Sequence, residues 1–223
     1  MFVKGLFNKS IQKEFPCSIT DQYVVLKPGY RKGLRGTISL VRRKNDGQLF
    51  VLKMVKGQED PNHSFANEMR SMGILQDLGL SKGNTFWAPD GESLLKTYVE
   101  GPTLTEVLRQ NNNFFSENSV ELEALKQLIM KLCKSSCYIG DLNSGNLIFN
   151  DQRWFIIDCG IIKYNLSYQE RIERYHGRFI HRWQRHLPDD HHAQLINFLK
   201  KLFAQMSEMN NNQHHGFSET ETI

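Results

Sequence analysis

The sequence has few cysteines, no long apolar run and little excess charge, and each shortage excludes a class of protein. The four cysteines, Cys17, Cys133, Cys137 and Cys159, include no C-x-x-C pair. Neither a disulfide framework nor a zinc site is indicated, and we expect a reducing compartment. No apolar run approaches the roughly 18 residues that a membrane-spanning helix needs, and the first residues lack a signal-peptide core. We therefore expect a soluble protein.

Charge and size set further limits. The net charge of +4 is small, and by itself it does not indicate nucleic-acid binding. The chain has 223 residues, 39% of them hydrophobic, which is enough for one sizeable core or for two small lobes. We expect two lobes.

The most informative stretch runs from Tyr138 to Gly160 and carries three polar side chains on two short loops. Asp141 and Asn146 precede the apolar run 147–149, and the apolar run 154–157 leads into Asp158. Turn-forming residues between the runs predict a hairpin, which brings the three polar side chains to one end. An Asp there can take a proton from a hydroxyl, while an Asn and a second Asp hold Mg²⁺ on ATP phosphates. The alternative is an ordinary Asn- and Asp-rich hairpin.

This stretch resembles the catalytic and metal-binding loops of the protein-kinase-like superfamily, D-x-x-x-x-N followed by D-x-G. The resemblance implies that Asp141 is the catalytic base and that Asn146 and Asp158 are the Mg²⁺ ligands. It covers roughly residues 23–165. It also implies an α+β, bilobal fold with a small antiparallel sheet lobe and a truncated, mainly helical lobe.

The resemblance and the composition together predict four segments. Residues 1–22 form a basic N-terminal arm, and residues 23–99 form the sheet lobe with one helix. Residues 100–206 form the helical lobe with both loops, after a break at Glu100-Gly101-Pro102. Residues 207–223 are polar and low in complexity, so we expect disorder there.

A glycine-containing segment precedes the loops. Gly33, Gly36 and Ile38 match the latter part of the kinase pattern G-x-G-x-x-G-x-V, and Arg31 stands at the first glycine position. Glycine lets backbone N–H groups close over phosphates because it has no side chain to block them. The resemblance implies ATP binding at these three residues. A plain hairpin is the alternative.

Lys53 lies in the apolar strand 49–55, which follows an Asn45-Asp46-Gly47 turn. Its distance from Ile38 resembles that between the glycine loop and the phosphate-binding lysine of kinases. The helix predicted over 62–78 has an apolar stripe that Glu68 borders. Glu68 can then reach Lys53 and hold it toward the ATP phosphates. The alternatives are a lysine on the solvent face of the strand and a solvated glutamate.

The segment Thr97, Tyr98 and Val99 corresponds by resemblance to the hinge whose backbone hydrogen-bonds adenine. Lys96 departs from the apolar or small side chain that is usual at its position. Ile139-Gly140 replaces the His-Arg of most eukaryotic protein kinases. Without an arginine next to the base in sequence, activation by a phosphorylated loop is not expected.

With Cys159 in place of the Phe of D-F-G, and with no A-P-E motif, the chain most resembles the minimal kinases of the OspG/NleH type, which bacteria inject into host cells. That likeness implies a secreted effector that reaches the host cytoplasm and acts on host proteins. It also implies a host activator such as a ubiquitin-loaded conjugating enzyme.

A late helix carries Arg171, Arg174, Arg178, Arg182 and Arg185. These arginines are either a solvated face or a surface for an acidic or phosphate-bearing partner. The leading hypothesis is an ATP- and Mg²⁺-dependent serine/threonine protein kinase. A sugar or lipopolysaccharide-core kinase is the second, since such kinases share the Gly-Asp loop and could hold an anionic acceptor with the arginines. A pseudokinase-like binding module with little catalysis is the third.

Overall fold

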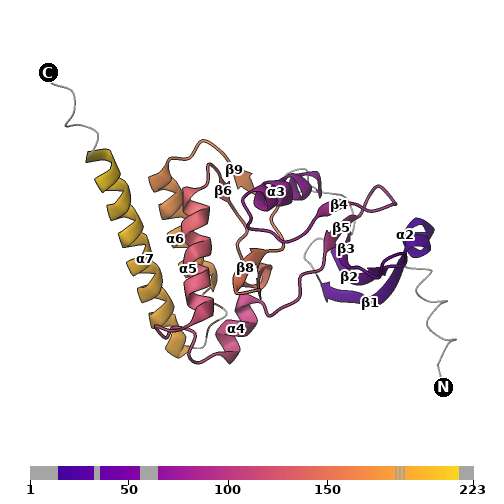
Figure 1. The fold of residues 1–223 in the computed structure, drawn as a ribbon, viewed down its shortest axis with the longest axis horizontal. Coiled ribbons are helices and arrows are strands. Elements are labelled where there is room, and N and C mark those ends of the chain that lie inside the picture. The colour runs from indigo at the N-terminus through magenta and orange to yellow at the C-terminus, as the bar shows by residue number, and fades with distance from the viewer. Residues whose placement is uncertain are drawn as a thin grey trace. The chain divides into compact units, whose positions relative to one another are not determined.

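The structure, a computed structural model, describes residues 15–32, 36–55, 65–183, 185, 187 and 189–215. The chain divides into two compact units, residues 1–99 and 100–223, and Figure 1 labels their elements. Within the described ranges, no helix combines the length and the apolar character needed to cross a membrane.

Unit 1 is an antiparallel sheet flanked by two helices. The strands are β1 (Tyr23–Lys32), β2 (Gly36–Arg43), β3 (Leu49–Val55), β4 (Thr85–Trp87) and β5 (Leu94–Thr97), and the helices are α2 (Cys17–Gln22) and α3 (Phe65–Asp77). The strands lie in the order β1-β2-β3-β5-β4. Each neighbouring pair is antiparallel. The predicted sheet lobe therefore has the expected composition of strands and one long helix.

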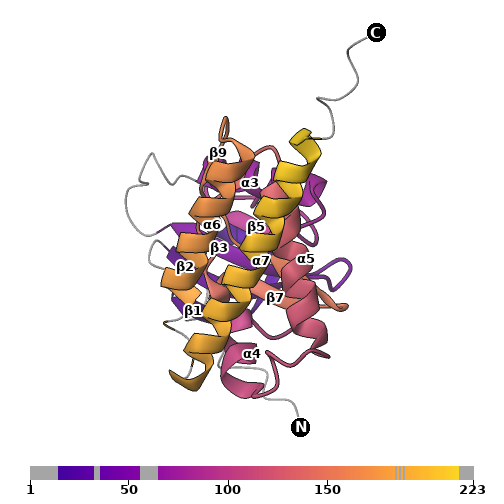
Figure 2. The ribbon, with the colours of Figure 1, turned by 90° about the vertical axis from the view of Figure 1, so that its left-hand side faces the viewer.

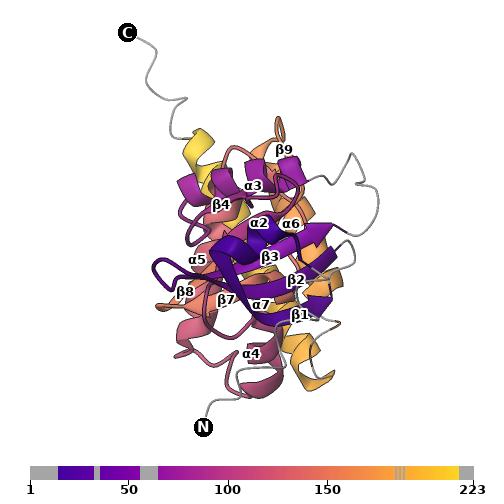
Figure 3. The same cartoon turned by 90° about the vertical axis from the view of Figure 1, so that its right-hand side faces the viewer.

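The two faces of the sheet have different partners because side chains alternate along a strand. One face carries Val41, Phe50, Leu52 and Leu95, which pack with Phe15 and Ile19 at α2 into an apolar core. Figure 3 shows α2 lying against these strands. The other face carries Lys53 and Lys96, and both ammonium groups contact Glu68 of α3. The sheet thus separates an apolar core from a charged cluster.

The turn between β2 and β3 is the hairpin that its sequence predicts. Gly47 has φ +74° and donates its N–H to Arg43 O at 3.0 Å. Only residues that tolerate the left-handed region suit this position. The guanidinium of Arg43 hydrogen-bonds Asp46, which lowers the pKa of that carboxyl to about 2. The turn sets the register that pairs Ile38 with Lys53 across the strands.

Unit 2 consists of long helices and short strand pairs. The helices are α4 (Leu104–Gln110), α5 (Val120–Lys134), α6 (Tyr168–Trp183) and α7 (Asp189–His215). The strands β6 (Tyr138–Ile139) and β9 (Ile162–Lys163) form one pair, β7 (Leu147–Asn150) and β8 (Arg153–Ile156) form another, and the short 3₁₀ helix η2 spans Ser144–Asn146. Figure 2 shows α5, α6 and α7 side by side. The predicted α+β fold class is confirmed.

Capping residues set where α4 and α5 begin. Thr103 and Glu106 form a reciprocal capping box at the start of α4, and Ser119 Oγ accepts from Leu122 N–H at the start of α5. Leu125, Leu128, Ile129 and Leu132 form a buried stripe along α5. Val120 is 52% exposed. It is the first residue after the cap, a full turn before the helix meets the core.

A column of aromatic side chains lies along the buried face of α6. Tyr175 stacks on Phe179 with ring centroids 5.5 Å apart, and Phe179 stacks on Trp183 at 4.2 Å. All three side chains are fully buried. Phe203 of α7 packs against Phe179 from the other side. The spacing of four residues places the rings on one face of the helix, which fixes how α6 is rotated about its axis.

Helix α7 corrects one expectation. Its helical backbone continues to His215, so the disorder predicted from residue 207 does not hold for 207–215. The composition there is polar, but Leu199, Leu202, Phe203 and Met206 are buried in the preceding turns. A helix anchored by such contacts propagates into polar sequence because each further residue adds a hydrogen bond. Residues 216–223 lie outside the described part of the chain.

The fold predicts the effect of removing one hydroxyl. Tyr175 Oη accepts the N–H of Ile139 at 2.8 Å in a buried setting, so Tyr175→Phe leaves that N–H unpaired. We expect the free energy of unfolding to fall by about 1–3 kcal/mol. Urea unfolding followed by circular dichroism measures this. Tyr164→Phe, at a side chain that is 54% exposed, is the matched control and should change little. Equal effects of the two variants would contradict the assigned hydrogen bond.

Candidate functional site

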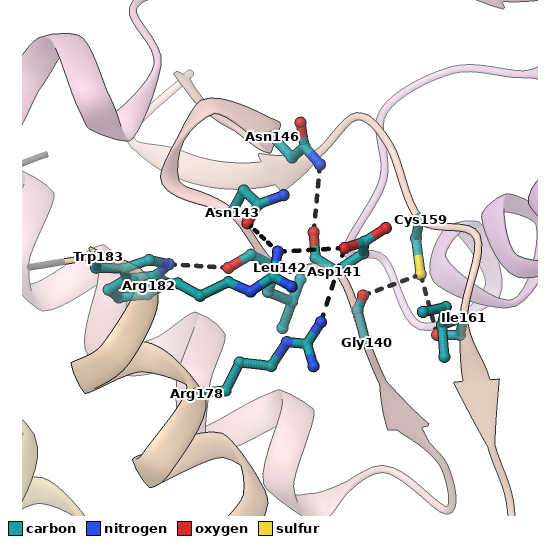
Figure 4. Close-up of polar contacts among 10 residues, drawn as sticks. All are labelled: Gly140, Asp141, Leu142, Asn143, Asn146, Cys159, Ile161, Arg178, Arg182 and Trp183. Carbon is teal, nitrogen blue, oxygen red and sulfur yellow. Dashed lines mark hydrogen bonds and ion pairs between the residues drawn. The ribbon is translucent and has the colours of Figure 1, made fainter. Parts of the chain in front are cut away.

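Asp141 has a backbone conformation that few residues adopt. Its φ is +62°, in the left-handed region where Asp and Asn are the best tolerated side chains after Gly. The Asp141 carbonyl oxygen accepts the N–H of Asn143 at 2.8 Å and the Nδ2 of Asn146 at 3.2 Å (Figure 4). These two hydrogen bonds hold the unusual turn in place. Backbone strain of this kind clusters at functional sites.

The β7–β8 hairpin brings Asn146 and Asp158 to one end, as its sequence predicts. Leu147 pairs with Ile156 at this end of the hairpin. Ile157 N–H then donates to Asn146 O at 2.9 Å. Asp158 is the next residue, and its side chain is half-buried. Hydrogen bonds within unit 2 therefore join Asn146 to Asp141 and to Ile157, the residue that precedes Asp158.

The donor set at this end suits Mg²⁺. Asn146 uses its amide nitrogen toward Asp141 O, which orients its oxygen as the remaining ligand atom. An amide oxygen and a carboxylate are hard ligands, and Mg²⁺ commonly takes one or two protein carboxylates together with substrate phosphates. Among the described residues, no group of three or more His, Cys, Asp or Glu side chains gathers as a metal site. The residues present fit a Mg²⁺-nucleotide better than a metal held by protein alone.

Gly140 and Cys159 explain two departures from common kinase sequences. Gly140 N–H donates to Ile161 O at 2.8 Å, and a Cβ on Gly140 would meet the Ile161 side chain at 3.0 Å. Cys159 is fully buried, and its thiol lies 3.5 Å from Gly140 O and 3.4 Å from Ile161 O. A larger side chain at either position would separate the two loops. The small residues let them pack directly on each other.

Two arginines of α6 reach the Asp141 carboxylate. Arg178 Nη2 lies 3.7 Å from Asp141 Oδ1, and Arg182 Nη1 lies 3.5 Å from the same oxygen. Arg182 also donates to Asn143 Oδ1 at 2.7 Å. Figure 4 shows both guanidinium groups directed at the Asp141 side chain. The sequence has no arginine next to this aspartate, but the fold places two beside it.

The same helix supports the loop with further hydrogen bonds. Trp183 Nε1 donates to Leu142 O at 2.9 Å, and the Ile139 N–H donates to Tyr175. The five arginines that the sequence analysis grouped together therefore divide into two sets. Those at 171, 178 and 182 contact the segment 133–143. Those at 174 and 185 are exposed, and the latter contacts His181.

In unit 1, Lys53 contacts Glu68 as expected. Lys53 Nζ lies 2.6 Å from Glu68 Oε2, and the side chains are 13% and 6% exposed. Lys96 is buried as well, and its ammonium contacts the other carboxylate oxygen, Glu68 Oε1. Glu68 is therefore shared by two lysines from neighbouring strands. The contact between Lys96 and Glu68 was not predicted. The sequence signal for it was a lysine among apolar residues on a central strand, on the same face of the sheet as Lys53.

The residues predicted to bind ATP are described in part. Gly33 lies outside the described residues, while Gly36 begins β2 and Ile38 pairs with Lys53. In the predicted hinge, Thr97 N–H donates to Asn84 O and Tyr98 N–H donates to Leu49 O.

Those two N–H groups are engaged and are not available to adenine. Val99 is buried, and among the described residues its backbone N–H has no such bond. The ATP-binding role of all these residues stays a prediction.

The roles of Arg178 and Arg182 in the site were also missed individually. Both lie on the turn beside buried aromatic residues at 175, 179 and 183. Each arginine follows one buried ring by three positions and precedes the next by one, which places it at the edge of the buried face, and this spacing was the signal that could have found them.

Comparisons with known proteins yielded structural likenesses alone. No protein-family model matches the chain, and no curated protein does. Among solved structures, the Cydia pomonella granulovirus kinase PK-1 is 20% identical, with a TM-score of 0.46 over 70% of this chain and 59% of that one. Cex1p is 18% identical, with a TM-score of 0.48 over 71% of this chain and 30% of that one. The chain thus matches less than two thirds of either protein. The likeness to the OspG/NleH type stays a prediction.

The shared carboxylate predicts an unusual pattern of stabilities. Glu68→Gln leaves two nearly buried ammonium groups without their counterion, so we expect it to lower the free energy of unfolding by about 3–5 kcal/mol. Lys96→Met should cost less than half of that because Glu68 keeps Lys53. Added to Glu68→Gln, Lys96→Met should restore part of the lost stability. Urea unfolding of the four proteins forms a double-mutant cycle, and simple additivity would contradict the shared ion pair.

Thiol labelling tests the packing around the two loops. Cys133, Cys137 and Cys159 are buried, while Cys17 is exposed. Burial raises the pKa of Cys133 to about 12, so its thiol stays protonated and unreactive at pH 8. We expect native protein to react quickly with Ellman's reagent at Cys17 alone, with the other thiols reacting on unfolding. Rapid native labelling of Cys159 would contradict the direct packing of the loops.

Proposed function

We propose that this chain is an ATP- and Mg²⁺-dependent phosphotransferase that acts on a hydroxyl acceptor. The observation that carries the proposal is the arrangement of Asp141, Asn146 and Asp158 in unit 2. There Asp141 has a strained backbone that Asn146 holds, and Asp158 follows the residue bonded to Asn146. Phosphoryl transfer depends on positioning and charge stabilisation rather than on covalent chemistry by the protein. Rigidly placed oxygen ligands next to a proton acceptor meet that need.

Each of these residues has a role in the proposal. Asp141 accepts the proton of the acceptor hydroxyl, and Asn146 and Asp158 hold the metal. Lys53, oriented by Glu68, neutralises phosphate charge. Bound Mg²⁺-ATP supplies the phosphoryl group and the cation that offsets its developing charge. The ion pair at 2.6 Å supports the assignment of Lys53 because a lysine held by one carboxylate points in one direction.

The acceptor class is the finer part of the proposal. A serine or threonine of a protein is the first candidate. The likeness to OspG/NleH kinases adds a host protein as substrate and a ubiquitin-loaded conjugating enzyme as activator, and both rest on that resemblance alone. A sugar or lipopolysaccharide-core hydroxyl is the second candidate. It is favoured by the two arginines beside Asp141, which suit an anionic acceptor.

Substitution of the loop residues tests the proposal. We expect Asp141→Asn to lower phosphoryl transfer by roughly 10²–10⁴-fold, the usual contribution of a positioned general base. Asp158→Ala should abolish transfer because the metal loses its carboxylate. The assay is transfer of labelled γ-phosphate from Mg²⁺-ATP to lysate proteins and to a glycolipid fraction.

Asp151→Asn is the matched control. Asp151 lies in the β7–β8 turn at φ +48°, which Asn also adopts readily, so its activity should be unchanged. Full activity in Asp158→Ala with retained circular dichroism would rule out the proposed metal role. Label on proteins alone, or on glycolipid alone, separates the two acceptor candidates.

A further inference from the structure

The arrangement around Asp141 identifies the kind of acceptor. We propose that Arg178 and Arg182 form an anion subsite for a small acceptor that carries a phosphate close to its reacting hydroxyl, as a sugar phosphate does. This inference rests on the phosphotransferase proposal, since it names the acceptor of that same site.

The contacts of the two arginines to Asp141 are long. Charge-assisted N–H···O bonds are typically about 2.7–2.9 Å long, whereas the two contacts to Asp141 Oδ1 measure 3.5 and 3.7 Å. Arg178 Nε is buried and has no hydrogen-bond partner among the described residues. A buried donor without a partner costs free energy that a bound acceptor atom recovers. The guanidinium of Arg178 therefore has donors available for a ligand.

The charges at this place also favour an anion. Two guanidinium groups face one carboxylate, which leaves one positive charge uncompensated by Asp141. The Arg178 and Arg182 side chains are 26% and 38% exposed, so a solute can reach them. Arg182 is held in position by Asn143 at 2.7 Å. A planar guanidinium fork matches the oxygens of a phosphate in two parallel hydrogen bonds.

The distances at the site fit a sugar phosphate. The reacting hydroxyl must come within roughly 3 Å of Asp141 to give up its proton, and both arginines lie within 4 Å of Asp141 Oδ1. An anion bound to the arginines therefore lies at most about 10 Å from the hydroxyl, because a hydrogen bond adds about 3 Å at each end of that path. In a sugar phosphate the two groups sit on one small carbon skeleton. A peptide brings an acidic group within the same span through a neighbouring residue, and the titration below separates the two kinds of acceptor.

Binding of the phosphate group also prepares the base. The anion draws the guanidinium donors onto its own oxygens, which leaves the Asp141 carboxylate for the hydroxyl. The acceptor oxygen then forms a bond to the γ-phosphorus, and its proton passes to Asp141. The bond from the γ-phosphorus to the β-phosphate oxygen breaks, and ADP leaves with that electron pair. An acceptor without a phosphate group lacks the means to displace the arginines.

Isothermal titration calorimetry tests the subsite with defined probes. The protein carries Mg²⁺ and a non-hydrolysable ATP analogue, so that phosphate cannot occupy the nucleotide site. Inorganic phosphate, glucose 6-phosphate, glucose and a serine peptide flanked by glutamates are titrated at one ionic strength.

The variants are Arg178→Gln with Arg182→Gln, and Arg178→Gln alone, which keeps the Arg182–Asn143 bond. The control is Arg174→Gln with Arg185→Gln, which removes the same charge from exposed positions.

We expect phosphate and glucose 6-phosphate to bind the wild type, and glucose and the peptide to bind at least tenfold more weakly. The double variant should lose roughly tenfold to a hundredfold in affinity for the phosphate probes, as expected when hydrogen bonds to a charged group are removed. The single variant should lose a smaller part. The control should stay within about twofold of the wild type, because long-range charge alone is screened.

Three results would overturn the inference: no binding of either phosphate probe to the wild type, an equal loss in the control, or binding of the peptide in preference to glucose 6-phosphate. The nucleotide titration tests the parent proposal separately. If the ATP analogue does not bind but arginine-dependent phosphate binding is found, the phosphotransferase proposal fails while the anion subsite stands. If the analogue binds and the phosphate probes do not, the subsite alone fails.

Discussion

The loop around Asp141 depends on a constraint that its own residues cannot meet: Asp141 must be held in a left-handed backbone conformation. Local bonds from Asn143 and Asn146 account for part of this. The rest comes from α6, whose residues bond to both sides of Asp141, at Ile139 and at Leu142. The buried aromatic column of α6 holds the helix in position, and hydrogen bonds from the helix hold the loop. Stability and chemistry in unit 2 therefore share one element.

Unit 1 shows a related arrangement with charges. A buried carboxylate that is paired with one lysine ties that lysine down, whereas Glu68 is shared between Lys53 and Lys96. In the proposed function Lys53 turns toward a phosphate, and Glu68 then keeps a counter-charge from Lys96, so no uncompensated charge is left in the interior. The lysine that departs from the usual apolar side chain at this strand position is thus consistent with a working phosphate-binding lysine.

The features that could be predicted from the sequence are those formed by residues close together along the chain. The β7–β8 hairpin and the turn at Asp46-Gly47 follow from periodicity and turn chemistry over short distances, and the contact between Lys53 and Glu68 was implied by the resemblance to kinases. The arginines beside Asp141 did not follow in this way, because they lie 37 and 41 residues further along the chain and only packing brings them back. The helical course of residues 207–215 was missed because composition says nothing of the anchor that precedes it.

The regular geometry of α6 fixes the spacing between the residues that contact the loop. A helix advances about 1.5 Å and turns about 100° with each residue, and α6 contacts α5 through Arg171 and the loop through Tyr175 and Trp183. Inserting or deleting one residue between Tyr175 and Arg182 would rotate one set of contacts away from the loop while the other stayed. Length changes in homologous chains should accordingly fall outside this interval, whereas single substitutions on its exposed face remain free to vary.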